Sequence, residues 1–125
     1  EPSNGLDIPS KTKFRKIMAE YCLDTTCTLI STHQVRDLEN LIDPIIILDN
    51  RAVLLNESLE NIAEKLCFTI ESSVPSDALY SEPTLGGYLC VKENKIERES
   101  KVNLEILFNA TMQHKALINK LFNNK

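Results

Sequence analysis

The chain lacks the features that would place it in several large functional classes. No apolar run approaches the roughly 18 residues needed to cross a bilayer, and the most obvious one covers only Ile45 to Leu48. Neither end carries a recognisable lipidation or retention signal. The formal net charge is -4 and the pI is near 5.2, so the basic excess typical of proteins that bind nucleic acid or anionic membranes is missing. We therefore expect a soluble protein without nucleic-acid or membrane partners.

Local motifs for metal binding and catalysis are also absent. A tetrahedral metal site uses closely spaced ligand pairs such as C-x2-C or H-x3-H, and neither spacing occurs. No G-x-S-x-G signature positions a nucleophile, and His33 and His114 are isolated residues suited to surface or capping roles. Carboxylate pairs such as Glu60 and Glu64 are typical of a solvated helix face. We expect no enzymatic activity, no metal and no cofactor.

The chain does contain an even number of cysteines and two N-x-S/T sequons. The cysteines are Cys22, Cys27, Cys67 and Cys90, and the sequons begin at Asn56 and Asn109. In a short chain this combination predicts a secreted, extracellular glycoprotein with two disulfide bonds. The missing start methionine fits removal of a signal peptide.

Four cysteines allow three pairings, and the sequence does not choose among them. A bridge between Cys22 and Cys27 is the least attractive, because positions five residues apart on one helix point to different sides. We expect bridges from this pair to Cys67 and Cys90, in either order.

The first part of the chain predicts two helices. Residues 1–10 contain two prolines, a glycine and no apolar period, which indicates a flexible arm. With Ser10 as N-cap, apolar side chains then recur at helical spacing and predict a helix over about Lys11 to Leu23. A capping box at Ser31 predicts a second, short helix that ends near Asp43, before Pro44.

The middle of the chain has the most regular apolar spacing. Steps of three and four residues connect Ile45, Leu48, Ala52, Leu55, Leu59, Ile62 and Leu66. This period predicts one helix from Pro44 to about Glu71, with a break at Asn56 as a variant. The alternative is a β-hairpin with strands Ile45 to Leu48 and Ala52 to Leu55, because isoleucine and valine favour strands. The unbroken period favours the helix.

The remainder predicts a long loop and a final helix. Ser72 to Gly87 is rich in serine, proline and glycine, which indicates a loop. An apolar stripe then predicts a helix from about Ser100 to just before Asn123. The expected fold is all-α: a single helical domain over residues 11–125, built as a compact antiparallel bundle of about four helices with two disulfides, and monomeric.

Two parts of this expected surface are candidates for partner binding. One is the basic cluster of the first helix, which consists of Lys11, Lys13, Arg15 and Lys16. These charges would steer the protein toward an acidic partner. The other is the loop around Pro83 and Tyr88, which would supply adaptable contact area.

A basic first helix followed by Tyr21-Cys22-Leu23-Asp24-Thr25-Thr26-Cys27 resembles the mosquito salivary family that contains anophensin and albicin. The resemblance covers size, helical character and cysteine content. It implies a salivary protein that is injected into a host, where it acts in immune evasion and on hemostasis. Such a protein would inhibit a host plasma cascade by masking a protein surface. The implied partners are the alternative complement pathway convertase or a protease of contact and kallikrein-kinin activation.

Two alternatives belong to other classes. A helical carrier, similar to insect odorant-binding proteins, would hold a small hydrophobic ligand in an apolar cavity between helices. Their usual six-cysteine pattern is absent here. A helical cytokine would present its first and last helices to a receptor. Thermal stabilisation of the protein by hydrophobic ligands would indicate the carrier, and receptor-dependent signalling in cells would indicate the cytokine.

Overall fold

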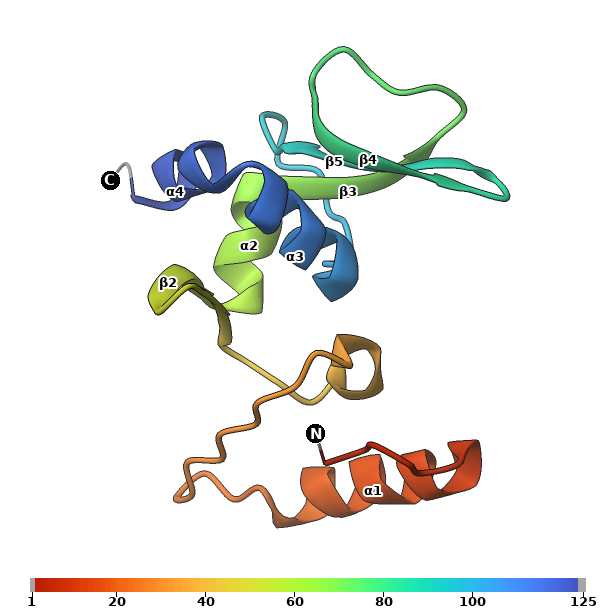
Figure 1. The fold of residues 1–125 in the computed structure, drawn as a ribbon, viewed down its shortest axis with the longest axis vertical. Helices are drawn as coiled ribbons and strands as arrows, with labels where there is room; N and C mark the ends of the chain where they lie inside the picture. The colour runs from red at the N-terminus through yellow and green to blue at the C-terminus, as the bar shows by residue number, and fades with distance from the viewer. Residues whose placement is uncertain (1, 124–125) are drawn as a thin grey trace. The chain divides into compact units, whose positions relative to one another are not determined.

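The computed structural model describes residues 2–123, and the chain divides into two compact units, residues 1–42 and 43–125 (Figure 1). The described residues form four α-helices, one 3-10 helix and five β-strands in two antiparallel sheets. The predicted all-α bundle was therefore wrong, and the fold is mixed α/β. No helix within residues 2–123 combines the length and apolar character needed to span a bilayer.

The first unit contains the helix predicted near the start. Helix α1, Ile8–Tyr21, begins earlier than expected because Asp7, and not Ser10, is its N-cap. The Asp7 carboxylate accepts a hydrogen bond from the Ser10 backbone N–H at 2.9 Å. Hydrogen bonding to the Ser10 side chain first, and to its backbone second, lowers the pKa of Asp7. No residue of α1 is fully buried. The helix prediction is confirmed, with its start moved into the expected arm.

The second helix of this unit is much shorter than predicted. Helix η1, Val35–Leu38, is a single 3-10 turn. Asp37 of this turn accepts hydrogen bonds from the Lys11 ammonium and the Ser3 hydroxyl, both at 2.8 Å. The bond from Lys11 is the main cause, and the bond from Ser3 the second, of the lowered pKa of Asp37. These bonds hold η1 against α1, while residues 22–34 between them form neither helix nor strand.

The second unit begins with a β-hairpin where one long helix was predicted. Strands β1, Ile45–Asp49, and β2, Ala52–Glu57, pair antiparallel. Asn50 and Arg51 join them with φ angles of 46° and 64°. Two successive residues with positive φ make the tight turn that matches the twist of paired strands. The long-helix prediction was wrong, and the hairpin alternative is confirmed.

The rest of the predicted long helix is divided between a short helix and a strand. Helix α2, Leu59–Lys65, is capped by Ser58, whose hydroxyl accepts from the Asn61 N–H at 3.1 Å. It passes directly into strand β3, Leu66–Glu71. The apolar seam is thus helical only over the two turns of α2, where Ile62 is buried.

A three-stranded antiparallel sheet replaces the predicted loop at Ser72 to Gly87. Strand β4, Ala78–Thr84, and strand β5, Gly87–Glu93, form a hairpin, and β5 also pairs with β3, giving the order β3-β5-β4. The loop prediction was therefore right for residues 72–77 and for the turn at residues 85–86, and wrong for the two strands. Pro83 had been interpreted as a loop residue, but proline is tolerated in an edge strand such as β4.

Two helices complete the second unit. The predicted final helix is interrupted at His114 into α3, Leu104–Gln113, and α4, Lys115–Asn123. Helix α3 packs against β4 and β5, and α4 packs against α3 and β2 (Figure 1). Lys65 ties α2 to α4, because its ammonium donates to the Leu121 carbonyl at 2.9 Å and lies 5.3 Å from the centre of the Phe122 ring. Fully buried side chains between these elements include Ile62, Leu66, Val91, Ile106, Leu107 and Ile118.

All four cysteines are free thiols, so the prediction of two disulfide bonds was wrong. Cys22 and Cys27 are exposed, and Cys67 and Cys90 are buried. The expected bridges required a long helix that would carry Cys67 beside the first one, and that helix does not exist. Cys67 and Cys90 lie on neighbouring strands, but Cys67 faces Lys92 and Cys90 faces Thr69. Burial raises the pKa of the Cys90 thiol.

Candidate protein-binding surface

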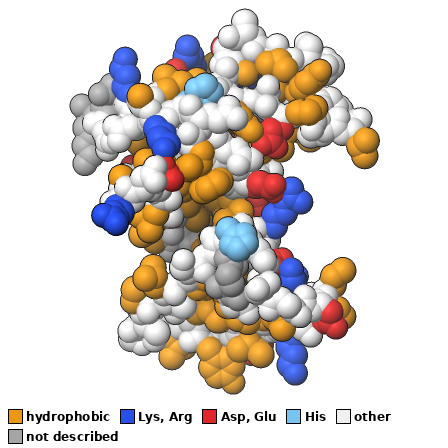
Figure 2. All heavy atoms as spheres, in the orientation of Figure 1, with side chains coloured by type: hydrophobic (Ala, Val, Ile, Leu, Met, Phe, Trp, Pro, Cys, Tyr) orange, Lys and Arg blue, Asp and Glu red, His pale blue; other side chains and the backbone are white. Residues whose placement is uncertain are grey.

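Exposed apolar side chains gather at one end of the three-stranded sheet. This sheet tip consists of Leu85 in the turn, Pro83 and Tyr88 on one face of the sheet, and Ile70 on the opposite face. Pro83 and Tyr88, both predicted as contact residues, lie directly opposite each other on β4 and β5. Leu85 occupies the turn between the strands and is fully exposed, while Ile70 on β3 is 65% exposed. Hydrophobic side chains over the sheet extend to the end of this hairpin (Figure 2).

The turn that presents Leu85 is held by specific contacts. The Thr84 hydroxyl donates to the Gly87 carbonyl at 3.2 Å and accepts from the Gly86 N–H at 3.3 Å. Gly87 has a φ of 130°, and a Cβ at this position would lie 2.3 Å from the Glu71 carbonyl oxygen. Only glycine allows this backbone conformation next to β3. Leu85 was not predicted as a contact residue, and Gly87 was predicted only as the end of a loop, although a Gly-Gly pair between strand-like segments is a hairpin signal.

The acidic side chain nearest Tyr88 on the neighbouring strand already has partners. Glu71, opposite Tyr88 in the β3–β5 register, accepts hydrogen bonds from the Thr69 hydroxyl at 2.9 Å and the Lys92 ammonium at 3.3 Å. The bond from Thr69 first, and the bond from Lys92 second, lower the pKa of Glu71. A partner that covers this face therefore does not have to desolvate an unpaired carboxylate.

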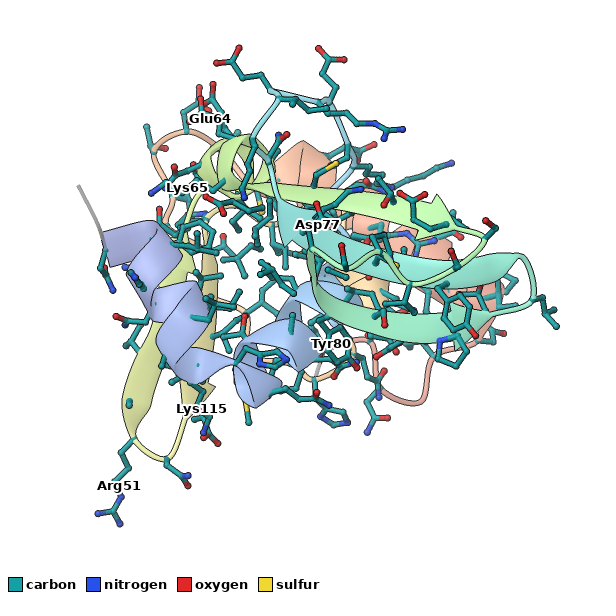
Figure 3. All side chains as sticks on the ribbon, turned by 90° about the horizontal axis from the view of Figure 1, so that it is seen from above. Arg51, Glu64, Lys65, Asp77, Tyr80 and Lys115 are labelled. Atoms are coloured by element: carbon teal, nitrogen blue, oxygen red, sulfur yellow. The ribbon has the colours of Figure 1, made fainter. Side chains whose placement is uncertain are left out.

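A second carboxylate is fixed by side chains of β4 and α3. Glu82 accepts hydrogen bonds from the Tyr80 hydroxyl at 2.6 Å and the Asn109 amide at 2.7 Å. Tyr80 is labelled where β4 approaches α3 in Figure 3. The bond to Glu82 is the main cause that raises the pKa of Tyr80 to about 12. These contacts fix the base of the hairpin that carries the sheet tip.

Replacing Glu82 with glutamine is expected to lower the pKa of Tyr80 toward its ordinary value of 10.0. The pKa falls because the negative phenolate of Tyr80 would no longer form beside the negative carboxylate of Glu82. Ultraviolet titration in a background with Tyr21 and Tyr88 changed to phenylalanine measures the single remaining tyrosine. In the unchanged hairpin, the neutral phenol contributes stability below pH 10, and this contribution is lost as the pH rises toward about 12. An unaltered titration in Glu82→Gln would contradict the assignment.

The four basic residues predicted as contacts all lie on α1, but they are not equivalent. Lys11 is engaged by Asp37, and the Arg15 guanidinium donates to the Thr12 hydroxyl at 3.2 Å. Lys13 and Lys16 are exposed and form no ion pair with the described part of the chain. Of these four, only the Lys11 charge is compensated by a carboxylate of the described chain, since the Thr12 hydroxyl that Arg15 contacts is neutral, so the charge available to an acidic partner comes from Lys13, Arg15 and Lys16.

The two sequons occupy different environments. Asn56 is exposed on β2, opposite Ile46. Asn109 lies within α3 and donates to Glu82, and the hydroxyl of its sequon partner Thr111 is fully buried and donates to the Leu107 carbonyl at 2.7 Å. A glycan at Asn109 would disrupt the contact with Glu82. Asn56 is thus the sequon that the folded chain leaves accessible.

A hollow of about 1190 Å³ lies between α2 and residues 94–101. Asn94 fixes this segment, since its side-chain amide donates to the carbonyls of Ala63 at 2.9 Å and Arg98 at 3.0 Å. Four glutamates and four basic residues line the hollow, including Glu64 and Lys65. Within residues 2–123, no three His, Cys, Asp or Glu side chains are arranged to hold a metal ion. This hollow has neither the apolar lining of a lipid carrier nor a recognisable catalytic arrangement.

Comparison of the chain with known protein families, with curated proteins and with solved structures found no match.

Proposed function

We propose that this chain is a non-enzymatic binding protein that inserts the sheet tip into an apolar pocket on a protein partner. The observation that carries the proposal is Leu85, a fully exposed aliphatic side chain on a turn fixed by Thr84 and Gly87. A large apolar side chain on a preorganised turn loses little conformational entropy on binding. Such anchors, when buried in a partner's pocket, supply most of an interface's free energy.

The neighbouring contacts support this role. Tyr88 and Pro83 add apolar area beside Leu85. The negative charge of Glu71 is already paired with the ammonium of Lys92 on β5. The alternatives are less well supported. The hollow of the second unit is lined largely by charged residues, which does not suit a carrier of hydrophobic ligands. The cytokine alternative required a four-helix bundle that the fold does not contain.

The partner class remains the one that the family resemblance implies, a host plasma protease complex of complement or contact activation. Inhibition would be masking of a surface without chemistry. Extracellular location is part of the same proposal and is supported by the accessible sequon at Asn56. The cysteines do not add support, because they are not bridged.

Immobilised protein is incubated with host plasma, with and without prior activation of complement and contact pathways. The retained complex is then purified and its affinity measured for Leu85→Ser, with Ile96→Ser as a matched control, because Ile96 is also aliphatic and highly exposed but lies in the loop after β5. We expect Leu85→Ser to weaken binding about thirtyfold or more, as for an interface anchor, and Ile96→Ser to leave it unchanged. Binding that is indifferent to Leu85 would refute the proposed surface, and no retention from activated plasma would refute the partner class.

A further inference from the structure

One face of the β1–β2 hairpin is aliphatic and exposed. Ile46, Leu48 and Val53 are 48%, 64% and 58% exposed, whereas Ile45 and Ile47, which alternate with the first two along β1, are buried. Alternate side chains of a strand point to opposite faces, and Leu48 lies directly opposite Val53. The three exposed side chains therefore share one face. A contiguous exposed apolar face of this kind marks a surface that another group covers.

The sequon residue Asn56 lies on the same face. In the β1–β2 register it is directly opposite Ile46, and directly opposed side chains have Cβ atoms about 4.5 to 5.5 Å apart on one face of the sheet. Asn56 is exposed, and its side-chain amide forms no hydrogen bond with the described part of the chain. Its amide nitrogen is therefore accessible beside the exposed side chain of Ile46.

From this placement we infer that an N-linked glycan at Asn56 covers the aliphatic face, with its first N-acetylglucosamine packed on Ile46. The inference rests on the extracellular location that is part of the proposed function. In the attachment step, Nδ2 of Asn56 attacks C1 of a lipid-linked oligosaccharide diphosphate of the secretory pathway. The Nδ2–C1 bond forms, the C1–O bond breaks, Nδ2 loses one proton and the lipid diphosphate leaves.

The chemistry of N-acetylglucosamine suits this face. Its ring presents C–H groups above and below, its acetamide ends in a methyl group, and its hydroxyls lie around the ring edge. Contact with Ile46 removes apolar area of both groups from water, while the hydroxyls at the edge stay hydrated. The covalent bond to Asn56 keeps the sugar at a high effective concentration beside the face, so a weak contact is enough to hold it there.

A protein partner is the other occupant that an aliphatic face could take. The attachment point argues for the glycan, because a branched sugar next to Ile46 would keep a protein surface from close contact with the hairpin. The sheet tip belongs to the three-stranded sheet and Asn56 to the two-stranded one. The two surfaces can therefore be tested separately.

The test uses the full chain secreted from cultured eukaryotic cells. Intact protein, protein trimmed by an endoglycosidase to a single N-acetylglucosamine, and the variant Asn56→Gln are compared. Mass spectrometry measures occupancy of Asn56, and circular dichroism follows thermal unfolding. We expect Asn56 to be occupied and the intact and trimmed forms to unfold within about 1 °C of each other. Asn56→Gln should unfold about 3 °C lower or more, because it loses the sugar that covers Ile46.

A second substitution tests the contact itself. Ile46→Thr keeps a β-branched residue in the strand but removes apolar surface, so in this background Asn56→Gln should change the unfolding temperature by less than about 1 °C. Ile70→Thr is the matched control, since Ile70 is also exposed and aliphatic but lies on β3, and it should leave the full effect of Asn56→Gln.

Several results would overturn the inference. These are an unoccupied Asn56, an unfolding temperature that Asn56→Gln leaves unchanged, and an effect of Asn56→Gln that persists in Ile46→Thr. Loss of a retained plasma partner in Ile46→Thr would also overturn it, because a protein would then occupy the face. The proposed function fails by a different result, which is binding that is indifferent to Leu85→Ser.

Discussion

Replacement of Gly87 with alanine is expected to lower the free energy of unfolding by about 3 kcal/mol or more. Two effects add. The φ of 130° is strained for any residue with a Cβ, and the new methyl group would lie 2.3 Å from the Glu71 carbonyl oxygen, which is backbone and cannot rotate away. Strand β5 is central in the sheet, so its displacement would disturb both neighbours. Urea denaturation followed by circular dichroism measures the change.

The adjacent glycine supplies the control. A Cβ on Gly86 would meet no atom within 4 Å, and its φ is not in the left-handed region. Gly86→Ala should therefore change stability by less than about 1 kcal/mol, in either direction. Equal effects of the two substitutions would contradict the described turn.

Leu107→Ala is expected to lower the free energy of unfolding by about 2 to 5 kcal/mol. Leu107 is fully buried in α3, the helix that covers one face of the three-stranded sheet. Its truncation removes apolar contact and leaves a cavity that the packed neighbours can fill only in part. The measurement is again the denaturant midpoint, with the slope of the transition checked for constancy.

The next residue of the same helix tests whether the loss comes from burial or from helix propensity. Phe108 is 41% exposed, and alanine favours a helix at least as well as phenylalanine. Phe108→Ala should cost clearly less than Leu107→Ala. If Phe108→Ala were the more damaging of the two, the orientation of α3 would be wrong.

The apolar spacing of the sequence predicted α1 and a final helical region, and both segments are helical in the structure. The error lay between Pro44 and Glu71. A seam with steps of three and four residues can also arise where a strand, a turn, a second strand and a short helix follow one another. Its members Ile45, Leu55 and Ile62 are buried here, but Leu48 is 64% exposed. The turn at Asn50 and Arg51 decides between these structures, and neither residue is glycine.

The three-stranded sheet was missed for a different reason. Its strands are stabilised by pairing between segments distant in sequence, such as β3 with β5, which periodicity cannot reveal. The candidate surface was partly predicted, since Pro83 and Tyr88 were selected as a contact region. That they face each other, with Leu85 projecting between them, depends on β4 and β5 being strands. The two disulfide bonds were wrongly predicted because that prediction depended on the number of cysteines and on the sequons, and not on the distances between the cysteines.

The four thiols form two classes that a thiol reagent should distinguish by their rates of labelling. Cys22 and Cys27 are exposed in the first unit, and a thiol reagent should modify them at once. Cys67 and Cys90 are shielded on β3 and β5, so their modification has to wait for the strands to open. The slow phase of labelling therefore reports how often the second unit opens in its native state, without an engineered label or a denaturant.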